Sequence, residues 1–191
     1  MEKDKITQTP VVLVPLAQGC EELEAVTITD LLARAGIKVI TAGLDNELVV
    51  ASRGMKLVPD YQLDEVMDTD FDMIVLPGGL PGADYLNQDP RIQSLVKKLA
   101  SENKYTAAIC AAPRVLATAG LLDGKQATSF PGALDQFPVN NLAYQQSAVV
   151  VDGKVVTSRG PGTAMEFALT LIELLLGKAK RDEVEAPLQR I

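Results

Sequence analysis

The sequence predicts an α/β protein with a doubly wound, mostly parallel sheet sandwiched between two layers of helices. Short apolar segments alternate with segments of helical periodicity along most of the chain. Hydrophobic residues make up 47% of the sequence but aromatic residues only 4%, and such an aliphatic core suits a sheet covered on both faces. The 191 residues contain no linker or repeat, so we expect one domain over 1–191, with disorder over 1–9.

The first half of the chain predicts β–α units that begin with an apolar strand. Gln18-Gly19-Cys20 forms the turn after the first strand, and Gly36 ends the helix that follows. Asp89-Pro90 supplies a cap and a first-turn residue for the next long helix. The expected strands of this half are residues 11–16, 37–42 and 73–76, the expected helices are 21–35 and 89–101, and the expected hairpin joins 48–51 to 55–58.

The second half continues the alternation and adds a second hairpin. Asp152-Gly153 is a strong two-residue hairpin signal, and Gly177 ends a long apolar helix. The expected strands are 105–109 and 127–129, the hairpin joins 147–151 to 154–158, and the expected helices are 113–120, 162–176 and a short one within 179–191.

Residues 106–114 form the segment around which we expect the site to be built. An apolar strand runs into Cys110, and Pro113 suits the first turn of a helix directly after it. A residue between a strand end and a helix start sits on a sharp turn that raises its side chain out of the sheet. The N–H groups at the helix start would favour the thiolate, the reactive form of cysteine. The alternative is a buried cysteine that packs as a small apolar residue.

Composition excludes several kinds of function. The net charge of −7 argues against nucleic-acid or anionic-membrane partners, and no apolar segment is long enough to span a bilayer, so we expect a cytoplasmic protein. The chain has no histidine, which removes Ser–His–Asp triads, Cys–His dyads and the commonest zinc ligand. We expect neither a metal nor a cofactor. A carboxylate, a cation or the backbone must then activate Cys110.

Three segments are expected to meet at the carboxyl edge of the sheet, where sites of this fold class lie. Gly78 and Gly79 lack side chains, so their N–H groups could join that of Ala111 in an oxyanion hole. Glu24 would lie near the same edge, where a partly buried carboxyl could carry protons in place of histidine. The alternatives are a plain tight turn at the glycines and a solvated carboxylate at the helix start.

Four motifs between residues 11 and 188 resemble the ThiJ/PfpI family, in particular its branch of the parkinsonism-associated deglycase and bacterial YajL-type proteins. The motifs are Gly19-Cys20-Glu21-Glu22-Leu23-Glu24, Val75-Leu76-Pro77-Gly78-Gly79, Ala108-Ile109-Cys110-Ala111-Ala112-Pro113 and Thr157-Ser158-Arg159-Gly160-Pro161-Gly162-Thr163. The resemblance implies a flavodoxin-like fold, similar to class I glutamine amidotransferases, and a homodimer.

The resemblance also implies roles for individual residues. Cys110 matches the family's oxidisable nucleophile, and Glu24 matches the carboxylic acid that bonds it. Arg53 is expected to reach the pocket across a dimer interface. The implied set comprises catalytic Cys110 and Glu24, oxyanion donors Gly79 and Ala111, and substrate-binding Gly78, Arg34 and Arg53.

Two functions are consistent with these residues. The first is a cofactor-free glyoxalase or deglycase, in which Cys110 attacks methylglyoxal, glyoxal or an early glycation adduct and Glu24 moves protons. The second is a non-enzymatic redox sensor or stress chaperone, in which a low-pKa Cys110 is oxidised to a sulfinic acid beside Glu24. Both need an accessible sulfur next to a carboxyl group.

The sequence departs from relatives at three positions. Ala111 stands where protease-type members have histidine, which argues against a peptidase. Phe130 replaces a histidine of the parkinsonism-associated protein and matches the phenylalanine of YajL-type proteins. Cys20 occupies a small-residue position, where we expect it to pack; the alternative is that it forms a disulfide with an oxidised Cys110.

Overall fold

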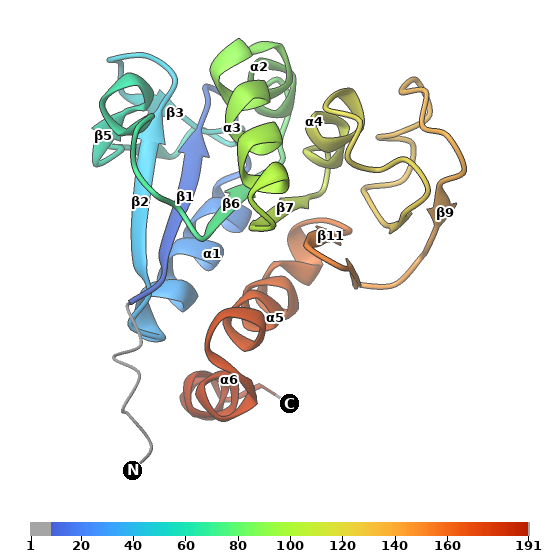
Figure 1. Ribbon diagram of the computed structural model, residues 1–191. Coiled ribbons are helices and arrows are strands. Elements are labelled where there is room, and N and C mark those ends of the chain that lie inside the picture. The colour runs from blue at the N-terminus through green and yellow to red at the C-terminus, as the bar shows by residue number, and fades with distance from the viewer. Residues whose placement is uncertain (1–8, 191) are drawn as a thin grey trace.

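The computed structural model describes residues 9–190, which form a seven-stranded sheet with helices on both faces (Figure 1). The strands lie in the order β10-β11-β7-β6-β1-β2-β5, and every pairing is parallel except that of β10 with β11. The strands are β1 (Val11–Leu16), β2 (Lys38–Gly43), β5 (Tyr61–Gln62), β6 (Met73–Leu76), β7 (Tyr105–Ile109), β10 (Val149–Asp152) and β11 (Val155–Ser158). The predicted doubly wound α/β architecture is confirmed.

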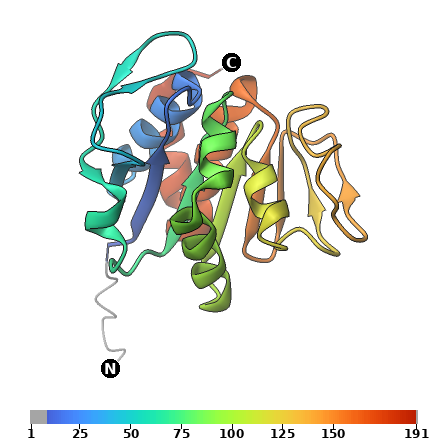
Figure 2. The same ribbon diagram turned by 90° about the horizontal axis from the view of Figure 1, so that it is seen from above.

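Two helical layers enclose the sheet, as the view in Figure 2 shows. One face is covered by α1 (Glu22–Arg34) and α5 (Ala164–Leu176), with α6 (Lys178–Glu185) packed on α5. The other face carries α2 (Gly82–Gln88), α3 (Pro90–Ser101) and α4 (Pro113–Thr118). Each layer has its own hydrophobic core, so both faces of the sheet are buried.

Strand β6 shows why the central strands are apolar at every position. Met73 and Val75 belong to the core shared with α1 and α5, whereas Ile74 and Leu76 belong to the core shared with α3 and α4. Successive side chains of a strand point to opposite faces, so a strand covered on both faces needs a continuous apolar run. All four side chains are fully buried.

The predicted hairpins are present, and several short elements were not predicted. Strands β3 (Val49–Val50) and β4 (Lys56–Leu57) pair antiparallel, as do β10 and β11. The unpredicted elements are α2, β5, the strand β9 (Ala143–Tyr144) that pairs with β8 (Gln126–Ala127), and 3₁₀ turns at Leu63–Val66, Pro161–Thr163 and Ala186–Leu188. They are too short to show a periodic pattern, and α2 begins at Gly82, directly after Pro81.

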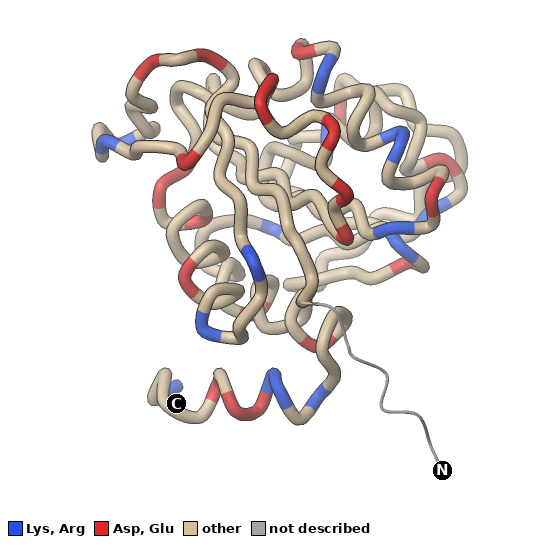
Figure 3. Tube along the Cα trace, turned by 60° about the vertical axis from the view of Figure 1, so that its left-hand side comes forward, with Lys and Arg blue, Asp and Glu red and all other residues tan. Residues whose placement is uncertain are grey.

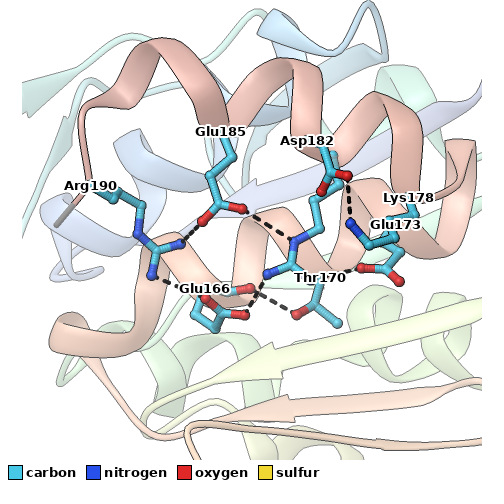
Figure 4. A network of polar contacts seen from close by, with 8 residues as sticks. Glu166, Thr170, Glu173, Lys178, Asp182, Glu185 and Arg190 are labelled. Carbon is cyan, nitrogen blue, oxygen red and sulfur yellow. Dashed lines mark hydrogen bonds and ion pairs between the residues drawn. The ribbon is translucent and has the colours of Figure 1, made fainter.

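Ion pairs fasten the charged C-terminal segment to α5. Figure 3 shows charges of both signs along this segment, and Figure 4 shows how they are paired. Arg181 contacts Glu166 at 3.0 Å and Glu173 at 2.9 Å, and Arg190 contacts Glu166 at 3.1 Å and Glu185 at 2.7 Å. Several partly buried pairs in one network hold more tightly than isolated surface pairs do. The expected short C-terminal helix is confirmed as α6.

The expected disorder over 1–9 falls almost wholly on residues 1–8, outside the described part of the chain. Thr9 is exposed and has no regular structure. Between residues 9 and 190, no helix combines the length and apolar character that crossing a bilayer requires.

Candidate active site

Cys110 occupies a strained turn between β7 and α4, as the sequence predicted. Its φ angle is +63°, in the left-handed region that costs an L-residue roughly 1–2 kcal/mol. Its N–H donates to the carbonyl of Ser158 at 2.9 Å, and its carbonyl accepts from the N–H of Phe130 at 2.8 Å. These two hydrogen bonds therefore hold the turn from both sides and offset its strain energy.

The Cys110 side chain lies at the wall of a cavity of about 480 Å³. The cavity is lined by polar residues including Glu21, Arg53 and Arg114, and by an apolar set that includes Phe130. Cys110 is only 8% exposed, and it is one of the residues that line this cavity. The cavity admits a small molecule to the sulfur, which the alternative of a sealed packing cysteine does not provide.

The backbone N–H groups of Gly79 and Ala111 donate toward the Cys110 sulfur. Both interactions favour the thiolate, as expected from the helix start. Burial and the charge of Glu24 oppose them and raise the pKa of Cys110 to about 12. This direction is opposite to the low-pKa thiolate expected from the sequence, because burial and the neighbouring carboxylate oppose the two backbone donors.

Glu24 is fully buried and lies against the thiol of Cys110. Its Oε2 accepts a hydrogen bond from the N–H of Gly78 at 2.8 Å, whereas Oε1 has no hydrogen-bond partner among residues 9–190. Burial raises the pKa of Glu24 to about 7, because the ionised form loses its hydration. The alternative of a solvated carboxylate is excluded, and near neutral pH this group exchanges protons readily.

Gly78 and Gly79 allow these groups to approach one another. A Cβ atom on Gly78 would lie 2.6 Å from Cβ of Cys110 and 2.8 Å from Oε2 of Glu24. Gly79 has a φ angle of +86°, and its own Cβ would lie 2.4 Å from the N atom of Glu21. Because the N–H of Gly78 is occupied by Glu24 and the residue does not line the cavity, its expected role as a substrate-binding residue is corrected to a close-packing role.

Arg53 lines the cavity of the chain that supplies Cys110. Glu22 holds the Arg53 loop in place, accepting hydrogen bonds from Ser52 Oγ at 2.9 Å and from the Arg53 N–H at 2.8 Å. These bonds anchor the β3–β4 turn to the start of α1. These bonds therefore fix the backbone of Arg53 beside the cavity.

Arg34 does not line this cavity, contrary to expectation. It pairs with Asp30 at 3.0 Å at the far end of α1. Ten residues separate it from Glu24, which corresponds to about 15 Å along a helix. Its placement in the pocket is corrected for the single chain.

Arg114 is a cavity residue that the sequence interpretation missed. It lies one helical turn after Cys110, and that spacing was the available signal. Its Nε donates to the carbonyl of Ala111 at 3.0 Å, and its guanidinium pairs with Asp84. Cys20 is fully buried and its thiol is free, which fits the expected packing role.

The described residues contain no group of three acidic or cysteine side chains placed to hold a metal ion. The site therefore offers one sulfur, one buried carboxyl, two backbone donors and two arginines. This set can form and break a covalent bond to a small carbonyl compound while moving protons.

A model of the DJ-1/PfpI family matches residues 10–174. The chain belongs to the DJ-1/PfpI family. Within this family, dj-1beta of Drosophila melanogaster is 47% identical over 174 residues, which cover 90% of this chain and 92% of that protein. Its crystal structure has a TM-score of 0.92 at 45% identity and covers 96% of this chain and 100% of that chain. The flavodoxin-like fold of the family is confirmed.

Two further members differ in length and in name. DJ-1 homolog A of Arabidopsis thaliana is 45% identical over 180 residues, which cover 93% of this chain, and the chain spans 46% of that protein's length. Glutathione-independent glyoxalase DJR-1.2 of Caenorhabditis elegans is 35% identical over 181 residues, which cover 95% of this chain and 96% of that protein.

Proposed function

We propose that this DJ-1/PfpI member is a cofactor-free glyoxalase or deglycase that uses Cys110 on methylglyoxal, glyoxal or early glycation adducts. The observation that carries the proposal is the contact between the Cys110 thiol, facing a cavity, and the buried carboxyl of Glu24, whose pKa is about 7. The relative named glutathione-independent glyoxalase supports it, since a protein thiol could stand in for that of glutathione.

In the first step, ionised Glu24 accepts the Cys110 proton as the sulfur bonds to the aldehyde carbon. The carbonyl oxygen becomes an alkoxide near the N–H groups of Gly79 and Ala111, which stabilise the developing charge. Glu24 then returns its proton to this oxygen, giving a neutral hemithioacetal. A base with a pKa of about 7 suits this exchange because both of its protonation states are populated near neutral pH.

In the second step, Glu24 takes the proton from the former aldehyde carbon and gives it to the oxygen of the adjacent carbonyl, which forms an enediol. Glu24 then takes the hydroxyl proton from the sulfur-bearing carbon and delivers a proton to the adjacent carbon. The hemithioacetal becomes a thioester of a 2-hydroxy acid, so one carbon is oxidised and its neighbour is reduced without an external oxidant. Water then attacks the thioester, the C–S bond breaks and Cys110 regains its proton. Methylglyoxal plus water gives lactate, and glyoxal plus water gives glycolate.

The redox-sensor alternative is less favoured by the electrostatics of Cys110. Peroxide reacts with the thiolate, and a pKa of about 12 keeps the free protein in the thiol form near neutral pH. In the proposed reaction, Glu24 removes the thiol proton as the carbon–sulfur bond forms. We place catalysis ahead of redox sensing because a relative is named glutathione-independent glyoxalase.

We further propose that the protein works in the cytoplasm as a homodimer. Reducing conditions there would keep Cys20 and Cys110 as thiols. Leu23, Val26 and Met55 are exposed apolar side chains on α1 and the adjoining β3–β4 turn, and a second copy could cover them. Sedimentation equilibrium would test this, and a monomer at micromolar concentration would contradict it.

The decisive experiment measures D-lactate formed from methylglyoxal without added thiol or cofactor. The wild type should release D-lactate and Cys110→Ala should not, while Cys20→Ala, which alters the other buried thiol, should retain activity. No lactate from the wild type would refute the enzyme. Peroxide-dependent suppression of aggregation that requires Cys110 would then favour the redox function.

A further inference from the structure

The two backbone donors beside the Cys110 sulfur come from different segments of the chain. Gly79 lies in the loop between β6 and α2, and Ala111 lies in the turn between β7 and α4. Strands β6 and β7 are paired as far as Leu76 and Ala108, so the separation of the two donors depends on what holds the segments beyond those residues. Oxyanion stabilisation requires donors to be fixed to within fractions of an ångström.

Arg114 holds the Ala111 side. Its Nε donates to the Ala111 carbonyl at 3.0 Å, and its guanidinium lies over the Phe137 ring with 5.4 Å to the ring centroid. Its side chain is only 13% exposed. A planar guanidinium that is fixed by a carbonyl and an aromatic ring has few other positions available.

Asp84 holds the Gly79 side. It lies on α2 and pairs with Arg114 through Oδ1 and Nη1. The N–H of the preceding residue, Ala83, donates to the carbonyl of Gly79 at 2.9 Å. A continuous series of contacts therefore runs from Gly79 through α2 and the ion pair to Ala111.

We propose that the Asp84–Arg114 pair positions the two donors around Cys110, acting as a clamp between the β6–α2 loop and the β7–α4 turn. The inference rests on the proposed function for its kinetic consequence, but not for its effect on the Cys110 thiol. Asp84 does not line the cavity, so replacing it disrupts the clamp without changing a residue of the cavity wall. Both are positioning residues and not catalytic ones.

The test compares Asp84→Ala with a matched control, Asp64→Ala. Asp64 pairs with Arg91 at 2.9 Å, and Arg91 also donates to a backbone carbonyl, that of Leu44, at 2.7 Å. The control therefore also removes an aspartate from an arginine that donates to a backbone carbonyl, although Arg91 keeps a second partner in Asp89, and neither Asp64 nor Arg91 lines the Cys110 cavity. Asp84→Glu tests rescue by a longer carboxylate.

Two quantities are measured in each variant: kcat and KM for methylglyoxal, and the rate of Cys110 alkylation by iodoacetamide at fixed pH, followed by mass spectrometry of the Cys110 peptide. For Asp84→Ala we expect kcat to fall roughly 10- to 100-fold with KM nearly unchanged, the cost of displaced catalytic groups. Alkylation should slow about three- to tenfold, because weaker donation raises the thiol pKa by about one unit. Asp64→Ala should match the wild type in both, and Asp84→Glu should recover part of the loss.

Unchanged kcat and alkylation in Asp84→Ala would overturn the clamp, as would an equal loss in Asp64→Ala. A fall in kcat with normal alkylation would also overturn it, since the donors would then be undisturbed. If the wild type forms no lactate, the proposed function fails, and the alkylation rates alone decide the clamp: slower alkylation in Asp84→Ala but not in Asp64→Ala supports it, and equal rates overturn it.

Discussion

Replacing Glu24 by glutamine should lower activity and raise stability at neutral pH. Glutamine keeps the size of the side chain and an oxygen that can accept the Gly78 N–H, but it carries no titratable proton. Loss of one acid–base group lowers turnover by about 10²–10⁴, which corresponds to roughly 3–5 kcal/mol in the activation free energy. We expect at least the lower figure because the chain has no histidine to take over.

The stability effect follows from the pKa of Glu24, which is 4.5 ordinarily and about 7 when buried in the folded protein. Between these values the folded protein retains a proton that the unfolded chain has lost, so wild-type stability is fully present below pH 4.5 and falls as the pH rises through 7. A pKa difference of this size lowers the free energy of unfolding of the wild type by about 3 kcal/mol by pH 8. Glu24→Gln lacks this loss, so its free energy of unfolding relative to wild type should rise by about that amount.

Urea unfolding followed by circular dichroism from pH 4.5 to 8 measures this difference, and the absence of tryptophan makes circular dichroism the suitable signal. Glu22→Gln is the control on the same helical turn. Burial alone would raise the pKa of Glu22, but hydrogen bonds from Ser52, Arg53 and Met55 lower it below its ordinary value. Replacing Glu22 should therefore add no pH dependence to the free energy of unfolding in this range. A Glu24→Gln profile parallel to wild type would refute a buried, protonated carboxyl, and undiminished turnover would refute its catalytic role.

Three further variants probe packing, substrate binding and the C-terminal network. Gly78→Ala should destabilise the fold by about 1–3 kcal/mol and abolish lactate formation, because its Cβ would lie 2.6 Å from that of Cys110; urea unfolding and the lactate assay check this. Arg53→Ala should raise KM for an anionic aldehyde such as glyoxylate about tenfold and leave KM for methylglyoxal nearly unchanged, as steady-state kinetics would show. Arg181→Ala should cost about 1–2 kcal/mol in unfolding free energy, with the difference shrinking in 1 M NaCl; equal losses at low and high salt would contradict an ionic network.

Much of the fold could be predicted from local patterns. Strand β6 is a run of apolar residues closed by Pro77-Gly78, and α3 is opened by Asp89-Pro90, so both elements were expected within one residue of their bounds. The missed helix α2 has seven residues and begins beside proline and glycine, where sequence patterns indicate a loop. Short elements like this form because the tertiary structure packs them, as Ala83 and Leu86 show by their complete burial.

The sequence alone determined the position of Cys110 between a strand and a helix, and tertiary structure decided the electrostatics around it. The strand–cysteine–proline order of residues 106–113 predicted that Cys110 lies on a turn, and the absence of histidine left Glu24 as the candidate proton carrier. Distances between segments far apart in the chain decide the pKa values of Cys110 and Glu24 and the hydrogen bond from the Gly78 N–H to Glu24. They also decide that Arg34 pairs with Asp30 and does not line the cavity of this chain. Desolvation and Coulomb interactions act through space, so local sequence patterns could identify these residues but not the charge that each one carries.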